Sequence, residues 1–252
     1  MSRIVDTADV DAWIEEIQGA SRAAFSEILA EGCDRAAIEA LARELFRRLG
    51  AAADEIARIT PARRLFACHK GCSACCHAFI QSTPLYTLAA FLHAAKHCPP
   101  DQRARQRQRA LTRHRPCPFL EERACQIYPA RPPVCRYYFS YDADWCAIDR
   151  CCVIDARDAD EGMRHRLLAR ASFAIERAAV EALASVGLTA EPHALDAGIR
   201  ILLNRPAALE RWLGGEAVFV EAVTPFTRHA FDWQPPLHGL GHGPEQGVIP
   251  AP

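Results

Sequence analysis

The sequence lacks three features, each of which would have pointed to a particular class of protein. Its 252 residues carry 30 basic and 31 acidic side chains, so no overall field draws the chain to nucleic acid or to an anionic membrane. No stretch approaches the ~18 consecutive apolar residues of a membrane span. The first thirteen residues lack a basic segment followed by an apolar run, the pattern of a secretory signal peptide. We therefore expect a cytoplasmic protein with no membrane partner.

Apolar residues recur at helical spacing over most of the chain, and this predicts a mostly α protein. Gly32 separates the first two helices, Pro61 ends the second, and Pro84 is placed to begin the third. With 50% hydrophobic residues, one domain over 1–234 can bury a core without crosslinks, and the Gly- and Pro-rich tail at 235–252 is expected to be disordered. The expected helices are 10–28, 38–59, 84–98, 101–113, 167–186, 194–203 and 207–213.

A cysteine-rich, metal-binding region is expected at about 66–152, and in its part from Arg115 to Cys152 prolines and cysteines replace the helical periodicity, which predicts a loop-rich segment. The whole region holds the most informative pattern in the chain, seven cysteines spaced as Cys68-x3-Cys72-x2-Cys75-Cys76 and Cys117-x7-Cys125-x9-Cys135. A buried structural cysteine is only a small hydrophobe and gains nothing from neighbours of its own kind. The density of thiols therefore indicates a chemical role.

Disulfides and metal ligation are the two chemical roles that compete. A reducing cytosol keeps thiols reduced, and Cys-dense cytosolic sequences are more often metal-binding or catalytic than crosslinked. Neighbouring Cα atoms such as those of Cys75 and Cys76 are ~3.8 Å apart, whereas a disulfide normally needs more than ~4.4 Å. Metal ligation is the favoured interpretation.

Thiolate sulfur selects Zn²⁺, iron–sulfur clusters or Cu⁺ over hard ions such as Ca²⁺ and Mg²⁺. A structural zinc takes four ligands, so seven or more thiols imply more than one metal atom. Cys68-x3-Cys72-x2-Cys75 also has the spacing of radical-SAM enzymes, but their alternating strands and helices are missing from this helical pattern. The cofactor is therefore expected to be an iron–sulfur cluster or zinc.

Cys146 is added as an eighth candidate ligand because it follows the motif most closely, while the roles of Cys151 and Cys152 stay open. Cys33 and Cys98 lie at helix ends, where a packing role is favoured. For His69 and His77 beside the first cysteines, a supporting or solvent-exposed role is favoured over ligation. The predicted metal ligands are Cys68, Cys72, Cys75, Cys76, Cys117, Cys125, Cys135 and Cys146.

Basic residues near these thiols would lower thiolate pKa values and offset the negative charge, although each could equally be an ordinary surface residue. They are Lys70, Arg115, Arg123, Arg131, Arg136 and Arg150.

The motif resembles the YkgJ-type cysteine-cluster family, also described as a zinc- or iron-chelating CxxCxxCC domain. The resemblance covers about 68–152 and extends to the residues around the thiols, in Cys72-Ser-Ala-Cys75-Cys76, Cys117-Pro-Phe-Leu120, Cys125-Gln-Ile-Tyr128 and Arg131-Pro-Pro-Val-Cys135-Arg136. It implies a metal centre on the seven motif cysteines. A related motif occurs in the flagellin lysine-N-methylase family, which implies methyl transfer as an alternative. No glycine-rich strand-to-helix turn that would hold a methyl donor is found.

Six arginines between Arg103 and Arg115 could grip phosphates, but at ~100° per residue they spread around a helix. A solvated helix is the favoured interpretation, and nucleic acid is not an expected partner.

The sequence thus predicts a helical protein that binds metal ions through thiolates in a structural or redox role, with a protein partner or substrate left open. The alternative is a metal-dependent enzyme, such as a protein-modifying methyltransferase related to flagellin lysine-N-methylase.

Overall fold

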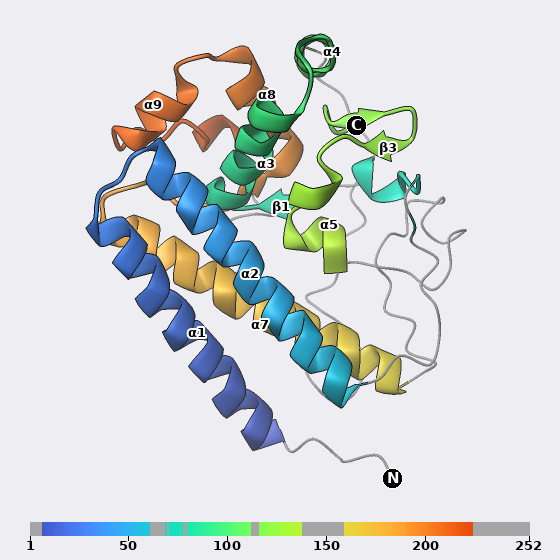
Figure 1. Cartoon of the computed structure of the whole chain (residues 1–252), viewed down its shortest axis with the longest axis vertical. Coiled ribbons are helices and arrows are strands. Elements are labelled where there is room, and N and C mark those ends of the chain that lie inside the picture. The colour runs from blue at the N-terminus through green and yellow to red at the C-terminus, as the bar shows by residue number, and fades with distance from the viewer. Residues whose placement is uncertain are drawn as a thin grey trace.

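A bundle of three long helices forms one part of the molecule in the computed structural model, which describes residues 7–60, 69, 71–77, 80–111, 116–137 and 159–223. Helices α1 (Thr7–Ala30), α2 (Arg35–Ile59) and α7 (Ala159–Ser185) lie side by side (Figure 1). Their apolar stripes meet in one core, because residues three and four apart share a helix face. Fully buried members of that core include Phe25, Ile38, Leu41, Leu45, Ile56, Leu167 and Ile175.

Local capping explains where α2 begins and ends. The Asp34 carboxylate accepts a hydrogen bond from the Ala37 backbone N–H at 2.9 Å, which satisfies one of the free donors of the first turn. At the other end, the Thr60 N–H donates to Ile56 O at 2.8 Å. Arg164 of α7 donates to the Thr60 carbonyl, so α7 holds the point where the chain leaves α2.

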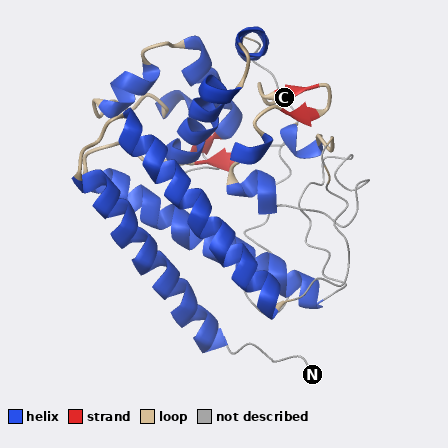
Figure 2. Ribbon diagram, viewed as in Figure 1, coloured by secondary structure: helices blue, strands red, loops and turns tan. Residues whose placement is uncertain are grey.

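A second layer of shorter elements packs beside the bundle and carries the cysteine loops (Figure 2). It contains the helices α3 (Pro84–His97), α4 (Pro100–Ala110), α8 (Leu195–Asn204) and α9 (Ala208–Leu213), and the 3₁₀ turns η1 (Ala74–Cys76) and η3 (Val220–Ala222). Its own core includes Ile80, Ala90, Ala94, Phe119, Ile127, Leu195, Ile199 and Leu203.

Two antiparallel ladders of two residues per strand pin this layer together. Strand β1 (Gln81–Ser82) pairs with β4 (His193–Ala194), with Gln81 opposite Ala194. The starts of α3 and α8 are therefore held next to each other. Strand β2 (Leu120–Glu121) pairs with β3 (Ala124–Cys125) in a tight hairpin inside the cysteine region.

The prediction of a mostly α protein is confirmed, and each expected helix has a counterpart. Helix α7 begins at Ala159, eight residues before its first predicted apolar position at 167, since its polar first turns escaped the hydrophobic pattern. The expected loop region contains regular structure where it is described, namely the hairpin, the 3₁₀ turn η2 (Tyr128–Ala130) and α5 (Pro133–Tyr137). The predicted tail at 235–252 lies outside the described residues.

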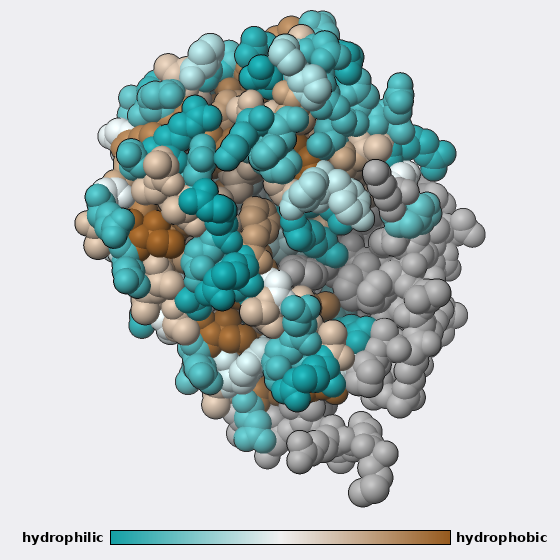
Figure 3. Space-filling model, in the orientation of Figure 1, coloured by the Kyte–Doolittle hydropathy of each residue, from teal (hydrophilic) through white to brown (hydrophobic). Residues whose placement is uncertain are grey.

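Polar residues cover much of the one face that Figure 3 shows, and the strongly hydrophobic residues on that face form small separate spots. None of the described helices combines the length and apolar character needed to cross a bilayer.

A close contact between Gly198 and His193 fixes α8 to the ladder. The His193 ring has its Nε2 2.8 Å from Thr87 Oγ1 and its Nδ1 3.2 Å from Glu191 O, and it stacks on Phe219 at 4.5 Å between centroids. A Cβ atom at Gly198 would lie 2.5 Å from His193 Nε2, which is closer than van der Waals contact allows. Only glycine therefore fits at this point of α8.

We expect Gly198→Ala to destabilise the protein by about 1–3 kcal/mol, the usual cost of overpacking a rigid core, despite alanine's better helix propensity. Gly50→Ala in α2 is the matched control, because nothing lies within 4 Å of its Cβ position. The stability of the Gly50→Ala variant should rise by up to ~1 kcal/mol. Urea unfolding of both variants gives the comparison, and equal midpoints would contradict the proposed contact.

Candidate metal centre

Six of the eight predicted ligands line one pocket, whose empty space is about 670 Å³ when the open solvent at its mouth is counted. They are Cys72, Cys75, Cys76, Cys117, Cys125 and Cys135. Cys68 and Cys146, together with Cys151 and Cys152, lie outside the described residues. The rest of the lining is Gly71, Ile80, Phe119, Ile127, Tyr128, Arg131, Pro132, Leu195, Asp196 and Ile199. Thiols more than sixty residues apart in the chain therefore face the same space.

The first cysteine group is formed by two tight turns. The Cys72 N–H donates to His69 O at 3.0 Å, and the Cys76 N–H donates to Ser73 O at 2.9 Å. Gly71, inside the first of these turns, has a φ of +99°, a conformation that side chains disfavour. The turns bring Cys72, Cys75 and Cys76 to one side of the pocket.

A backbone hydrogen bond joins this group to the second one. The Cys117 N–H donates to Cys76 O at 2.9 Å. From there the chain enters the β2–β3 hairpin, in which Cys125 is paired with Leu120. Cys117 and Cys125 consequently come to the pocket from the two sides of one hairpin.

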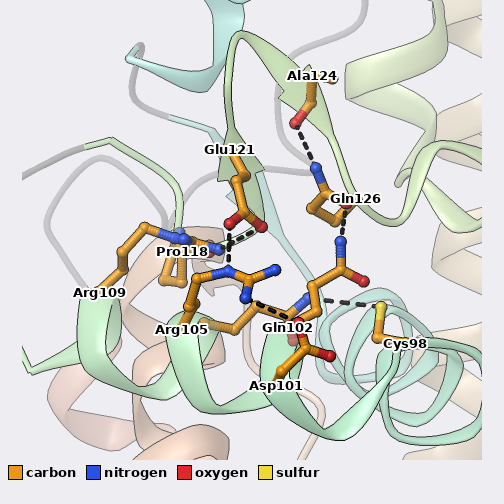
Figure 4. A network of polar contacts seen from close by, with 10 residues as sticks. Cys98, Asp101, Gln102, Arg105, Arg109, Pro118, Glu121, Ala124 and Gln126 are labelled. Atoms are coloured by element: carbon orange, nitrogen blue, oxygen red, sulfur yellow. Dashed lines mark hydrogen bonds and ion pairs between the residues drawn. The ribbon is translucent and has the colours of Figure 1, made fainter.

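Helix α4 holds the hairpin from outside, as Figure 4 shows. Arg105 donates to Glu121 of β2, and Arg109 donates from Nε to Pro118 O at 2.9 Å. Gln102 donates to the side chain of Gln126, next to Cys125. The expectation of a merely solvated arginine helix is therefore incomplete, because two of its arginines bind the cysteine hairpin. The hairpin was not foreseen, so the sequence offered no partner for them.

Arg200 of α8 binds backbone carbonyls on both sides of residues 112–115. Its Nη1 donates to Arg109 O at 2.7 Å and its Nη2 to Pro116 O at 2.9 Å. Asn204, one turn later, donates to Ala110 O at 3.0 Å. These bonds satisfy carbonyls at the end of α4 and fix the residue that precedes Cys117.

Cys135 reaches the pocket from the start of α5. Its N–H donates to Pro132 O at 2.9 Å, and its neighbour Arg136 donates from Nε to Arg131 O at 2.9 Å. The Arg136 guanidinium also lies 5.0 Å from the centre of the Phe46 ring in α2. Arg136 therefore braces the turn against the bundle and does not line the pocket.

Burial and mutual repulsion dominate the thiol electrostatics. Burial raises the pKa of Cys117 to about 12, and it also raises the pKa values of Cys125 and Cys135. Cys75 is the exception, because a hydrogen bond from Cys76 lowers its pKa to about 6 and raises that of Cys76. Most of these thiols keep their protons at neutral pH unless a cation replaces them.

Arg131 is the basic residue among the described lining residues. Its charge lowers the pKa of Cys75 and opposes the raised pKa values of Cys125 and Cys135. Its guanidinium stacks on Tyr128, 3.7 Å from the ring centre. Of the other basic residues predicted near the thiols, Arg123 lies in the exposed hairpin turn, and Lys70, Arg115 and Arg150 lie outside the described residues.

Asp196 is a lining residue that the sequence analysis missed. It stands in the first turn of α8, some sixty residues after the last motif cysteine, and nothing in the local sequence marks it. Its negative charge contributes to the raised pKa of Cys117, after the larger effects of burial and of Cys125. A carboxylate thus joins the thiols at this pocket.

The remaining cysteines and histidines stand apart from the lining. Cys33 packs against the core of the three-helix bundle, and Cys98 is buried in the second core, where its sulfur accepts a hydrogen bond from Gln106 Nε2 at 3.4 Å. His69 and His77 are exposed and do not line the pocket. The eight described cysteines are all free thiols.

Coordination would still require movement of side chains. In the part of the chain that the structure describes, no three His, Cys, Asp or Glu side chains already stand in an arrangement that could hold a metal ion. The donor set itself fits a soft metal, since six thiols share a partly enclosed space with one guanidinium to offset their charge. Binding would therefore bring the donor atoms of the lining closer together.

The hairpin turn stores strain that a substitution can remove. Glu122 and Arg123 have φ values of 48° and 63°, which suit Asn and Gly in a two-residue hairpin loop. We expect Glu122→Asn with Arg123→Gly to stabilise the protein by about 1 kcal/mol. Arg123→Gln controls for the lost charge and should have little effect, whereas a destabilised double variant in urea unfolding would contradict the turn geometry.

Comparison with known families agrees with this chemistry. Residues 67–166 match the family model CxxCxxCC, described as "Putative zinc- or iron-chelating domain". No curated protein and no solved structure matches the chain. The match supports zinc or iron binding by the segment that contains all of the predicted ligands.

Proposed function

We propose that this chain is a metal-binding protein that holds more than one metal atom through cysteine thiolates, as separate zinc ions or as an iron–sulfur cluster. The observation that carries the proposal is the shared pocket of six motif thiols. The proposed ligands are these six together with Cys68 and Cys146, which lie outside the described residues. A reducing cytosol is the compartment in which such free thiols would persist.

The burial of the thiols favours a site that binds metal over a site that holds only protonated, metal-free thiols. The raised pKa values of Cys117, Cys125 and Cys135 mean that these groups resist ionisation alone. A bound cation removes that resistance, because its charge attracts the thiolates that otherwise repel one another. Metal uptake should therefore release protons, and the affinity should rise with pH.

When bound, the metal would supply either a structural crosslink or, as a cluster, a site for electron transfer. The protein's own contribution is to position the thiols through the Cys76–Cys117 bond and the α4 contacts, and to offset their charge with Arg131. The metal ions are the partners that the site calls for.

A second candidate is a metal-dependent enzyme. The favouring observation is the apolar part of the pocket, formed by Ile80, Phe119, Ile127, Leu195 and Ile199, which would offer a small organic group an apolar contact surface beside a metal. A protein-modifying methyltransferase related to flagellin lysine-N-methylase is one version of this candidate. It would require binding of a methyl donor, which calorimetry on the metal-loaded protein can test.

Metal analysis of protein purified without oxygen tests the proposal directly. We expect at least two metal atoms per chain, because six or more thiols exceed the four ligands of one tetrahedral zinc. A brown protein with visible absorption would identify iron–sulfur, and a colourless protein would identify zinc. One tightly bound metal atom would contradict the stoichiometry, and none would contradict metal binding.

A further inference from the structure

Asp196 is a charged side chain at the pocket to which neither the cysteine motif nor the matched family segment assigns a role. It belongs to α8, beyond residue 166, and it is half-buried against the thiols. We propose that Asp196 is an oxygen ligand of the metal centre, which gives the centre a mixed sulfur and oxygen donor set. This inference rests on the proposed function.

The backbone around Asp196 is fixed relative to the cysteines. The N–H of the preceding residue, Leu195, donates to Ile80 O at 2.8 Å, and the β1–β4 ladder lies directly before it. One turn later, Arg200 holds the carbonyl of Pro116, next to Cys117. Backbone contacts of α8 therefore anchor Asp196 next to the second cysteine group.

Its carboxylate is also available. Among the described residues, no hydrogen bond or ion pair involves the Asp196 side chain, whereas Asp101 in the first turn of α4 pairs with Arg105 at 2.8 Å. Arg200 stands at the same i+4 position relative to Asp196 that Arg105 has relative to Asp101. Arg200 instead directs two guanidinium nitrogens to backbone carbonyls.

When the thiols bind a metal as thiolates, an unpaired carboxylate beside them adds a further negative charge that the metal ion would offset. Arg131 lines the pocket, and the charge of Arg200 acts on Cys117 as well. A helix N-terminus favours an acidic residue anywhere in the first turn, so the dipole does not explain a carboxylate that faces thiols. Coordination does, because zinc and iron both accept carboxylate oxygen.

A mixed donor set changes what the centre can do. A site closed by four thiolates is typical of structural zinc, whereas catalytic zinc sites combine ligand types and keep one exchangeable position. A carboxylate held on α8 can release the metal without unfolding the cysteine loops. Asp196 would thus mark the side on which a small ligand enters, next to the apolar Leu195 and Ile199.

The test uses the full chain, free of oxygen, with Co²⁺ as the probe because its visible spectrum reports the donor set. We expect Asp196→Asn to keep the thiolate-to-cobalt charge-transfer band, to shift the ligand-field bands and to weaken Co²⁺ binding at least ~10-fold. Glu210→Gln is the matched control, since Glu210 is an exposed first-turn carboxylate of α9 away from the pocket. It should match the wild type.

X-ray absorption of the zinc-loaded wild type gives a reading that does not depend on how the variant folds. Zinc–sulfur and zinc–oxygen distances differ, at ~2.3 Å and ~2.0–2.2 Å. A pure sulfur shell, or an Asp196→Asn variant with wild-type affinity and spectrum, overturns the inference and leaves the thiolate centre intact. A wild type without any thiolate band would instead overturn the proposed function.

Discussion

Replacing Cys135 with serine is expected to remove most of the bound metal and to cause the largest loss of stability among the changes considered. The Cys135 thiol lines the pocket, and burial together with the charges of Cys75, Cys117 and Cys125 raises its pKa. Metal binding at structural sites in small zinc domains contributes on the order of 10 kcal/mol to folding. The loss should concentrate in the described segment 116–137, where hydrogen exchange would become faster.

Cys33→Ser is the control for this experiment. Cys33 packs against the α1–α2–α7 core and does not line the pocket, so its replacement should keep full metal content and cost ~1 kcal/mol. Cys76→Ser should behave as Cys135→Ser does. If Cys76→Ser and Cys135→Ser retain the metal content of the wild type, the thiols are not ligands, and if Cys33→Ser loses metal, the division between ligands and core cysteines is wrong.

Arg200→Ala is expected to destabilise the protein by about 3 kcal/mol and to weaken metal binding as well. The guanidinium makes two charged hydrogen bonds to carbonyls, each of which contributes ~1.5–3 kcal/mol. Without them, the end of α4 and the residue before Cys117 lose a common anchor. Thermal unfolding of the metal-free and metal-loaded forms separates the two effects.

Arg205→Ala, five residues further along, provides the comparison. Its ion pair with Glu221 is exposed, with a nitrogen–oxygen distance of 2.7 Å, and exposed pairs contribute ~0–1 kcal/mol. Metal affinity should be unchanged in this variant. Equal losses of stability in Arg200→Ala and Arg205→Ala would show that the hydrogen bonds to Arg109 and Pro116 contribute no more than an exposed ion pair.

The helices could be predicted because their signals are local. The buried positions of α2 follow the three- and four-residue spacing visible in the sequence, and Pro84 occupies the first turn of α3 as expected. The start of α7 was missed because polar residues carry no such signal. The β2–β3 hairpin was also missed, since Glu122 and Arg123 are poor markers of a two-residue turn.

The candidate site could be predicted only in part, and for a similar reason. Cysteines are rare enough that their spacing alone selected the six thiols that share the pocket. Asp196 and Arg200 are ordinary residue types on an ordinary amphipathic helix. Their importance arises from the packing of α8 against the cysteine loops, a long-range contact that no short motif encodes.

The Cys76–Cys117 hydrogen bond bears on the conformational entropy of the unfolded chain. It brings together two points separated by all of α3 and α4, so a metal held by both cysteines would close a loop of about 40 residues in the unfolded chain. The chain-entropy relation for crosslinks puts such a closure at about 4 kcal/mol. A metal centre of this kind would act as a crosslink that, unlike a disulfide, reductants leave intact and a chelator removes reversibly.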